Sequence, residues 1–211
     1  MTDWEAGDRQ LLENLERALA EGAARAGAHL ACRPGCIECC VGPFPITVLD
    51  AWRLQRALEE LERNDPQRAA RVRERARNAV REMSEDFPGD LASGLLHDDL
   101  EAQDRFFERH ADLPCPLLNP ETGLCEVYAA RPLSCRTFGL PVRIGDQDLP
   151  PCQLCFRGAP AQEIEACRVL IDPEGLEDQI LGDAGELETL IAFALAGCGA
   201  PVRPPASSQR T

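Results

Sequence analysis

The chain of 211 residues contains no lysine, so all 22 of its basic residues are arginines. It also has few aromatic residues, 5% of the total, and only three histidines. No apolar run approaches the roughly 18–20 residues that span a bilayer. Acidic residues number 36, which gives a net charge of −14. Nucleic acids and anionic membrane surfaces attract basic proteins, so this charge excludes both as expected partners.

Cysteine is abundant by contrast, with 11 residues, more than a core of this size requires. The N-terminal segment has no basic stretch followed by an apolar one, so we expect no signal peptide and a cytoplasmic location. In a reducing compartment, cysteines serve metal binding or catalysis more often than disulfides. We expect a single helical metal-binding domain over residues 1–198 and a disordered tail over 199–211.

Most of the chain has the apolar spacing that is typical of helices. The patterns predict helices over about 8–30, from 47 through the leucines at 54, 58 and 61, over 65–86, 98–110, 161–171, and 173–196 with an interruption near Gly182. Thr47 followed by Asp50 resembles a capping box, and Asp65 before Pro66 fits an N-cap. Strand patterns occur only at 124–128 and 140–144. The expected fold class is mainly α, a single domain whose cysteine-rich loops are organised around a metal site.

The cysteines of this chain form two sequence groups separated by about seventy residues. The first is Cys32, Cys36, Cys39 and Cys40; the second is Cys115, Cys125, Cys135, Cys152 and Cys155. Two residues separate each of the pairs 36/39 and 152/155, which is the spacing of a metal-binding knuckle. Thiolates at this density repel one another, and a bound cation removes that cost. The sequence therefore predicts a metal site.

Four of the cysteines allow separate interpretations. Cys39 and Cys40 are adjacent, so one of them could serve a second metal or a redox role. Cys167 and Cys198 lie among apolar residues, and we expect both to be packing residues.

The string CRPGCIECC, followed by CPLL, GLCEVY, ARPLSCRTFG and a later cysteine, resembles the YkgJ family of cysteine-cluster proteins. These are also described as zinc- or iron-chelating domains with a CxxCxxCC-type signature. The resemblance covers roughly residues 30–155. It implies a site of about eight cysteines: Cys32, Cys36, Cys39, Cys40, Cys115, Cys125, Cys135 and either Cys152, which is slightly favoured, or Cys155. Some relatives carry the labels iron–sulfur oxidoreductase or flagellin lysine N-methylase, so an enzymatic activity stays open.

Two kinds of metal centre fit this set of ligands. We prefer an iron–sulfur cluster because His29, His97 and His110 all lie outside the motifs, although a four-cysteine zinc site fits as well. A cluster would serve a redox role or a cluster-dependent modification of a protein substrate. The alternative is a structural zinc module that binds a protein partner without catalysis.

A third and less favoured hypothesis is a radical SAM-type enzyme. The spacing of Cys32, Cys36 and Cys39 matches that class. However, Glu38 stands where these enzymes usually have an aromatic residue, and the chain lacks the strands of their partial barrel.

Arginines accompany the cysteines and also fill one predicted helix. Arg131 and Arg136 flank Cys135, and we hypothesise that they neutralise a metal–thiolate centre and donate hydrogen bonds to sulfur. In the predicted helix over 65–86, arginines such as Arg68 and Arg75 alternate with glutamates. This pattern predicts a solvated face with ion pairs within the helix.

Overall fold

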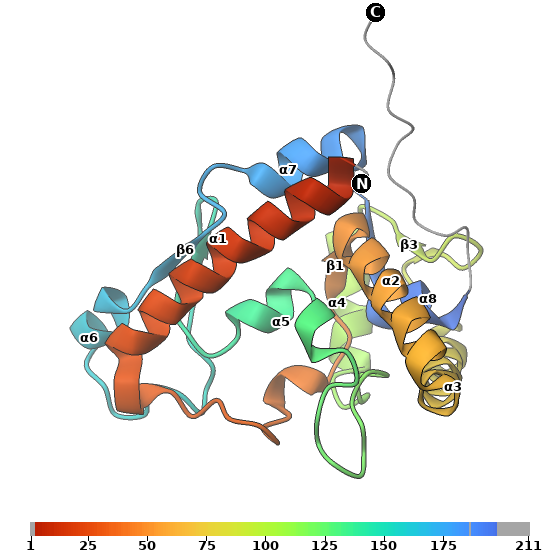
Figure 1. The fold of residues 1–211 in the computed structure, drawn as a ribbon, viewed down its shortest axis with the longest axis horizontal. Coiled ribbons are helices and arrows are strands. Elements are labelled where there is room, and N and C mark those ends of the chain that lie inside the picture. Colours follow the sequence, from red (N-terminus) through yellow and green to blue (C-terminus); the bar gives the residue numbers. More distant parts are fainter. Residues whose placement is uncertain (1–2, 186, 198–211) are drawn as a thin grey trace, which may run out of the picture. The chain divides into compact units, whose positions relative to one another are not determined.

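The computed structural model describes residues 3–185 and 187–197. About 53% of it is helical, with eight α-helices and a few short strands, which confirms the mainly α prediction. The described chain divides into two compact units (Figure 1): the first holds residues 3–33 and 134–183, and the second holds 34–133 and 184–197 without 186. Whether residues 1–198 act as one domain stays a prediction. The expected tail and Cys198 lie outside the described residues.

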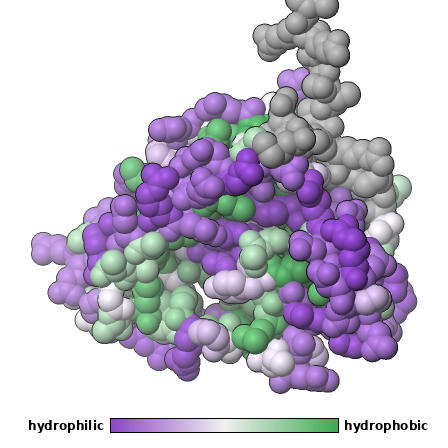
Figure 2. Space-filling view, in the orientation of Figure 1, coloured by the Kyte–Doolittle hydropathy of each residue, from purple (hydrophilic) through white to green (hydrophobic). Residues whose placement is uncertain are grey.

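The first unit is built on one long helix, α1 (Asp3–Ala26). Its apolar side buries Trp4, Leu11 and Leu15, and it lies along α7 and β6 (Figure 1). Its polar side faces solvent and is mostly hydrophilic in Figure 2. The other elements of this unit are η1 (Gly27–His29), α5 (Leu133–Thr137), β4 (Val142–Ile144), β5 (Gln147–Leu149), α6 (Ala161–Ala166), β6 (Val169–Ile171), α7 (Leu176–Leu181) and η4 (Gly182–Ala184).

A small sheet in the order β5-β4-β6 packs against α1 in this unit. β4 pairs antiparallel with β5 and parallel with β6. The helix comes close to the sheet at Gly22, where a Cβ atom would lie 2.4 Å from Cγ2 of Val169 and 3.2 Å from Cδ1 of Leu140. A glycine inside a helix costs about 1 kcal/mol relative to alanine. Here it allows the helix backbone to approach the sheet.

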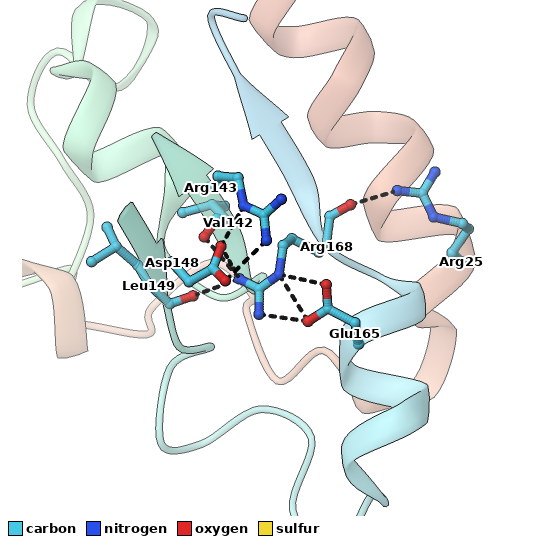
Figure 3. A network of polar contacts seen from close by, with 7 residues as sticks. All are labelled: Arg25, Val142, Arg143, Asp148, Leu149, Glu165 and Arg168. Carbon is cyan, nitrogen blue, oxygen red and sulfur yellow. Dashed lines mark hydrogen bonds and ion pairs between the residues drawn. The ribbon is translucent and has the colours of Figure 1, made fainter. Parts of the chain in front are cut away.

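Charged side chains join the sheet to the helices around it (Figure 3). Arg168, just before β6, binds Glu165 of α6 through Nη2 at 2.7 Å and lies 3.5 Å from Asp148 of β5. Asp148 also accepts a hydrogen bond of 2.6 Å from Nε of Arg143 on β4. Arg25 of α1 donates to the carbonyl oxygen of Arg168 at 3.3 Å. The network fastens strands that have only three residues each.

The second unit combines helices with a four-stranded antiparallel sheet in the order β1-β7-β3-β2. Helices α2, α3 and α8 pack on one another (Figure 1), around a core that includes Leu54, Val72 and Leu195. The elements are η2 (Glu38–Cys40), β1 (Pro45–Thr47), α2 (Val48–Asn64), α3 (Pro66–Met83), β2 (Gly89–Asp90), β3 (Leu95–Leu96), α4 (Leu100–Arg109), η3 (Tyr128–Ala130), β7 (Glu188–Leu190) and α8 (Ile191–Ala196).

The predicted starts of α2 and α3 are confirmed. Oγ1 of Thr47 accepts a hydrogen bond from the N–H of Asp50 at 3.3 Å. Oδ1 of Asp65 accepts one from the N–H of Arg68 at 3.0 Å, and Pro66 is the first helical residue. Each side chain satisfies an N–H group that the helix itself leaves unpaired.

Three secondary-structure predictions need correction. The helix expected over 161–171 ends at Ala166, and Val169–Ile171 is strand β6, because these apolar and mostly β-branched residues pair with β4. The segment 173–196 divides into α7, η4, β7 and α8. The strand expected over 124–128 is absent from the described residues, where Cys125 makes an isolated bridge to Leu118. The strand expected over 140–144 is confirmed as β4.

A membrane span is not found in the part of the chain that the structure describes: none of its helices is both long and apolar enough. The cytoplasmic location stays a prediction.

Candidate metal centre

In the second unit, backbone pairing joins the two cysteine-bearing segments. The N–H of Cys115 donates to the carbonyl oxygen of Cys40 at 2.8 Å, and Val41 forms an antiparallel bridge with Pro114. The N–H of Gly42 donates to the carbonyl oxygen of Leu113 at 2.9 Å. Residues that are about seventy-five positions apart in the sequence are therefore direct neighbours.

A hairpin-like turn brings the next cysteine to the same place. Leu118 bridges Cys125, and the N–H of Glu126 donates to the carbonyl oxygen of Leu117 at 2.8 Å. The tip is closed by Asn119, whose side chain accepts the N–H of Glu121 at 2.9 Å. The loop containing Cys36 contacts this tip: a Cβ atom on Gly123 would lie 3.7 Å from Cα of Gly35 and 3.8 Å from Cγ2 of Ile37.

The pKa values of four thiols in this unit depend on one another. The S–H of Cys40 donates a hydrogen bond to the sulfur of Cys39. This hydrogen bond, together with the charge of Arg131, lowers the pKa of Cys39 to about 6. The same hydrogen bond, together with burial, raises the pKa of Cys40. Burial raises the pKa of Cys115 to about 12 and also raises the pKa of Cys125. These four sulfurs form one electrostatically coupled group, which we call the second-unit thiols.

The second-unit thiols are not spaced as ligands around a single ion. Among residues 3–185 and 187–197, no three His, Cys, Asp or Glu side chains are grouped so that they could hold a metal ion. The donors nevertheless fit the metals that thiolates prefer, because four sulfurs belong to this coupled group.

Of the remaining candidate ligands, Cys36 lies in the second unit outside this coupled group, and Cys32, Cys135, Cys152 and Cys155 lie in the first unit. Two of them meet at Gly139, where a Cβ atom would lie 2.7 Å from the sulfur of Cys32 and 3.9 Å from that of Cys155. Cys155 is buried, and its sulfur accepts the N–H of Ala31 at 3.3 Å. These contacts place Cys155 beside Cys32, although the sequence slightly favoured Cys152 as the late ligand.

The turn that carries Cys155 is held by local contacts. The N–H of Cys155 donates to the carbonyl oxygen of Cys152 at 2.8 Å, and the N–H of Phe156 donates to that of His29 at 2.8 Å. Phe156 has φ of 53°, which is rare for a residue with a side chain. Its ring stacks on the imidazole of His29 with 5.3 Å between centroids. His29 thus supports the turn from the end of η1.

The two arginines that flank Cys135 in the sequence have different surroundings. Arg131 lies 3.9 Å from the ring centroid of Tyr128. Its charge contributes to the lowered pKa of Cys39 and partly opposes the effect of burial, which raises the pKa of Cys125. Arg136 has a side chain only 1% exposed and forms an ion pair of 2.7 Å with Glu16 of α1. A contribution of Arg136 to a metal centre stays a prediction. Cys167 is buried, in agreement with its interpretation as a packing residue.

Arg68 and Arg75 of α3 pair with a glutamate outside the helix, whereas the sequence pattern predicts ion pairs within the helix. Nε of Arg68 forms an ion pair with Oε2 of Glu126, and Nη2 of Arg75 forms one of 3.1 Å with Oε1 of the same carboxylate. The side chain of Glu126 is 1% exposed. Sequence reasoning missed this group because the partners are more than fifty residues apart. The only local sign was an acidic residue directly after a cysteine.

The fold and the thiols define a mainly α-helical, cysteine-cluster protein. The chain belongs to the CxxCxxCC family, whose description is "Putative zinc- or iron-chelating domain", and the family model matches residues 31–155. The match covers more than half of the chain and contains all nine candidate ligands, as the resemblance predicted. No curated protein and no solved structure gives a significant match.

Proposed function

We propose that the protein is an iron-chelating protein whose second-unit thiols, Cys39, Cys40, Cys115 and Cys125, hold an iron–sulfur cluster. One observation carries the proposal: the hydrogen bond from Cys115 to Cys40 brings two distant cysteine segments into one coupled group. A bound cation would relieve the repulsion of their thiolates. When bound, a cluster of this kind supplies one-electron transfer.

The cysteine motifs contain no histidine, which favours a cluster over a single zinc ion. The two centres also space their cysteine ligands differently. Tetrahedral zinc with Zn–S bonds of about 2.3 Å requires sulfurs roughly 3.8 Å apart. In a cluster each cysteine can bind a different iron, so its ligands are spread more widely. The distances between sulfurs in the loaded protein would therefore distinguish the two centres.

The second candidate is a structural zinc module that binds a protein partner. Exposed apolar side chains next to the cysteines of the second unit favour it. Tyr128 is 64% exposed, and Leu124, Ile37 and Val41 are also exposed. Such residues around a metal site are suited to contact with another protein.

Purification without oxygen, followed by elemental analysis and a visible spectrum, tests the two candidates. We expect iron, acid-labile sulfide and a reversible redox transition. Cys115→Ser should abolish the colour, whereas Cys167→Ala, at a buried cysteine outside the group, should retain it. A colourless protein with stoichiometric zinc would establish the zinc module instead.

The first-unit cysteines, Cys32, Cys135, Cys152 and Cys155, form the second part of the proposal. We propose that they supply further thiolate ligands for metal, with Cys155 rather than Cys152 as the partner of Cys32. The contact of both sulfurs with Gly139 supports this choice. Metal stoichiometry in Cys155→Ser and Cys152→Ser provides the test, since only the first should lose metal.

A further inference from the structure

We propose that Arg68, Glu126 and Arg75 form a clamp that positions Cys115 and Cys125 for metal binding. The inference rests on the proposed function of these cysteines. Both clamped segments are one residue away from a proposed ligand. Glu126 directly follows Cys125, and Nε of Arg75 donates to the carbonyl oxygen of Pro116, which directly follows Cys115, at 2.9 Å.

The register of α3 makes the clamp possible. Arg68 and Arg75 are seven residues apart, so they lie on the same side of the helix and are separated by about two turns. One guanidinium binds each oxygen of the Glu126 carboxylate, and Nη2 of Arg68 also donates to the carbonyl oxygen of Glu126 at 3.2 Å. The carboxylate is thereby held from two directions.

Apolar packing fastens the same hairpin to the same helix. Val72 and Ala76 of α3 are fully buried in a core cluster that also contains Leu117 and Val127. Leu117 and Val127 alternate with the clamped positions along the hairpin. The apolar contacts hold the hairpin against α3, and the directional hydrogen bonds fix its position along the helix.

A buried carboxylate with two arginines stabilises packing less efficiently than apolar residues would. Removing such charges from water costs free energy, and apolar residues of similar volume often pack as well or better. The charged groups add a fixed orientation, because the N–H groups of a guanidinium donate to a carboxylate in only a few geometries. Residues that orient metal ligands in this way typically change metal affinity by 10–100-fold when they are replaced.

The direction in which two substitutions change cobalt(II) affinity distinguishes positioning of the cysteines from a simple effect of charge. Glu126→Gln removes a negative charge near the thiols, and Arg75→Gln removes a positive one. If charge alone mattered, the two variants would change cobalt(II) affinity in opposite directions. If the clamp positions the cysteines, both variants bind cobalt(II) at least about tenfold more weakly and show less thiolate-to-cobalt absorption.

A matched control exists on the same helix. Arg73 forms an ion pair of 2.8 Å with Glu62 of α2, and both side chains are more exposed than Glu126. Glu62→Gln and Arg73→Gln should leave cobalt(II) affinity and the spectrum unchanged. Circular dichroism checks that each variant is folded. Because the Arg75 side chain is 26% exposed, Arg75→Gln provides the test if Glu126→Gln does not fold.

The experiment also measures the clamp without metal. In reduced, metal-free protein, we expect alkylation of Cys115 and Cys125 to be several-fold faster in both clamp variants, and alkylation of Cys155 to be unchanged. If the wild type binds no metal, the proposed function fails while this measurement still tests the clamp. Unchanged alkylation at Cys115 and Cys125, or cobalt(II) affinities that shift in opposite directions, would overturn the clamp.

Discussion

The two units hold their cysteines in different ways. In the second unit, backbone pairing joins the segments around Cys40 and Cys115, and two arginines of α3 bind the buried Glu126 next to Cys125. In the first unit, Cys135 lies in α5, whereas Cys32, Cys152 and Cys155 lie in loops, and Cys32 and Cys155 meet beside Gly139, which has no side chain. Thiols can therefore be brought together either by backbone pairing or by a glycine that leaves space for them. The first mode depends on charge and hydrogen bonds, and the second on the absence of a Cβ atom.

Metal removal is the largest expected perturbation, and it tests how strongly the thiols of the second unit depend on a bound metal. The proposed ligand segments are about seventy residues apart and would share a site only in the native state, so we expect the free energy of metal binding to contribute directly to folding. A chelator should lower the melting temperature, reduce helix content and accelerate alkylation of Cys115 and Cys125. Circular dichroism and mass spectrometry measure these effects. An apo protein with unchanged thermal unfolding would contradict the prediction.

Asp50→Ala should destabilise the second unit next most strongly. The Asp50 side chain is 2% exposed, pairs with Arg53, and accepts the N–H of Leu133 at 3.2 Å. Removing one partner of a buried ion pair costs about 3–5 kcal/mol. Urea unfolding measures the loss, and Glu62→Ala, at a largely exposed ion pair, should cost less than about 1 kcal/mol. Equal effects of the two substitutions would show that the buried carboxylate does not hold this unit together.

Gly139→Ala tests the contact on which the first-unit thiols depend. Gly139 has φ of 107°, and its new methyl group would lie 2.7 Å from the sulfur of Cys32. We expect a loss of about 1–3 kcal/mol and faster alkylation of Cys155. Gly158→Ala is the matched control, because Gly158 also has positive φ, 76°, but no atom within 4 Å of its Cβ position. If both variants behave alike, backbone strain alone explains the effect and the sulfur contact is unimportant.

Acid should loosen the small sheet of the first unit, which is the smallest expected effect. Hydrogen bonds from Arg143 and Arg168 hold the pKa values of Asp148 and Glu165, respectively, below their usual range. Carboxyls with lowered pKa values stabilise the fold above the unfolded pKa of roughly 4, and this stabilisation is lost as the pH falls below it. Hydrogen exchange of the β4 and β5 amides from pH 6 to pH 3 provides the measurement. Arg143→Gln should flatten the pH dependence; an identical pH profile in this variant would contradict the assignment.

Local sequence patterns predicted those elements whose signals lie within a few residues. The caps at Thr47 and Asp65, the apolar stripe of α3 and strand β4 are all as expected. Strand β6 was missed because Val169–Ile171 is a strand only through pairing with β4, which lies twenty-seven residues earlier. The clamp was missed for the same reason: the charge pattern of α3 favours pairs within a helix, whereas Arg68 and Arg75 bind a glutamate of the cysteine hairpin.

The sequence by itself determined the mainly α class, the helix caps and membership of a zinc- or iron-chelating family, because these depend on local propensities and on the order of cysteine motifs. Only the tertiary structure decided how the nine candidate ligands divide between two units, which late cysteine lies beside Cys32, and that Glu126 is buried between two arginines. Each of these depends on which distant segments pair and on where a glycine, such as Gly139, leaves room for other side chains. Spacing along the chain does not encode such contacts.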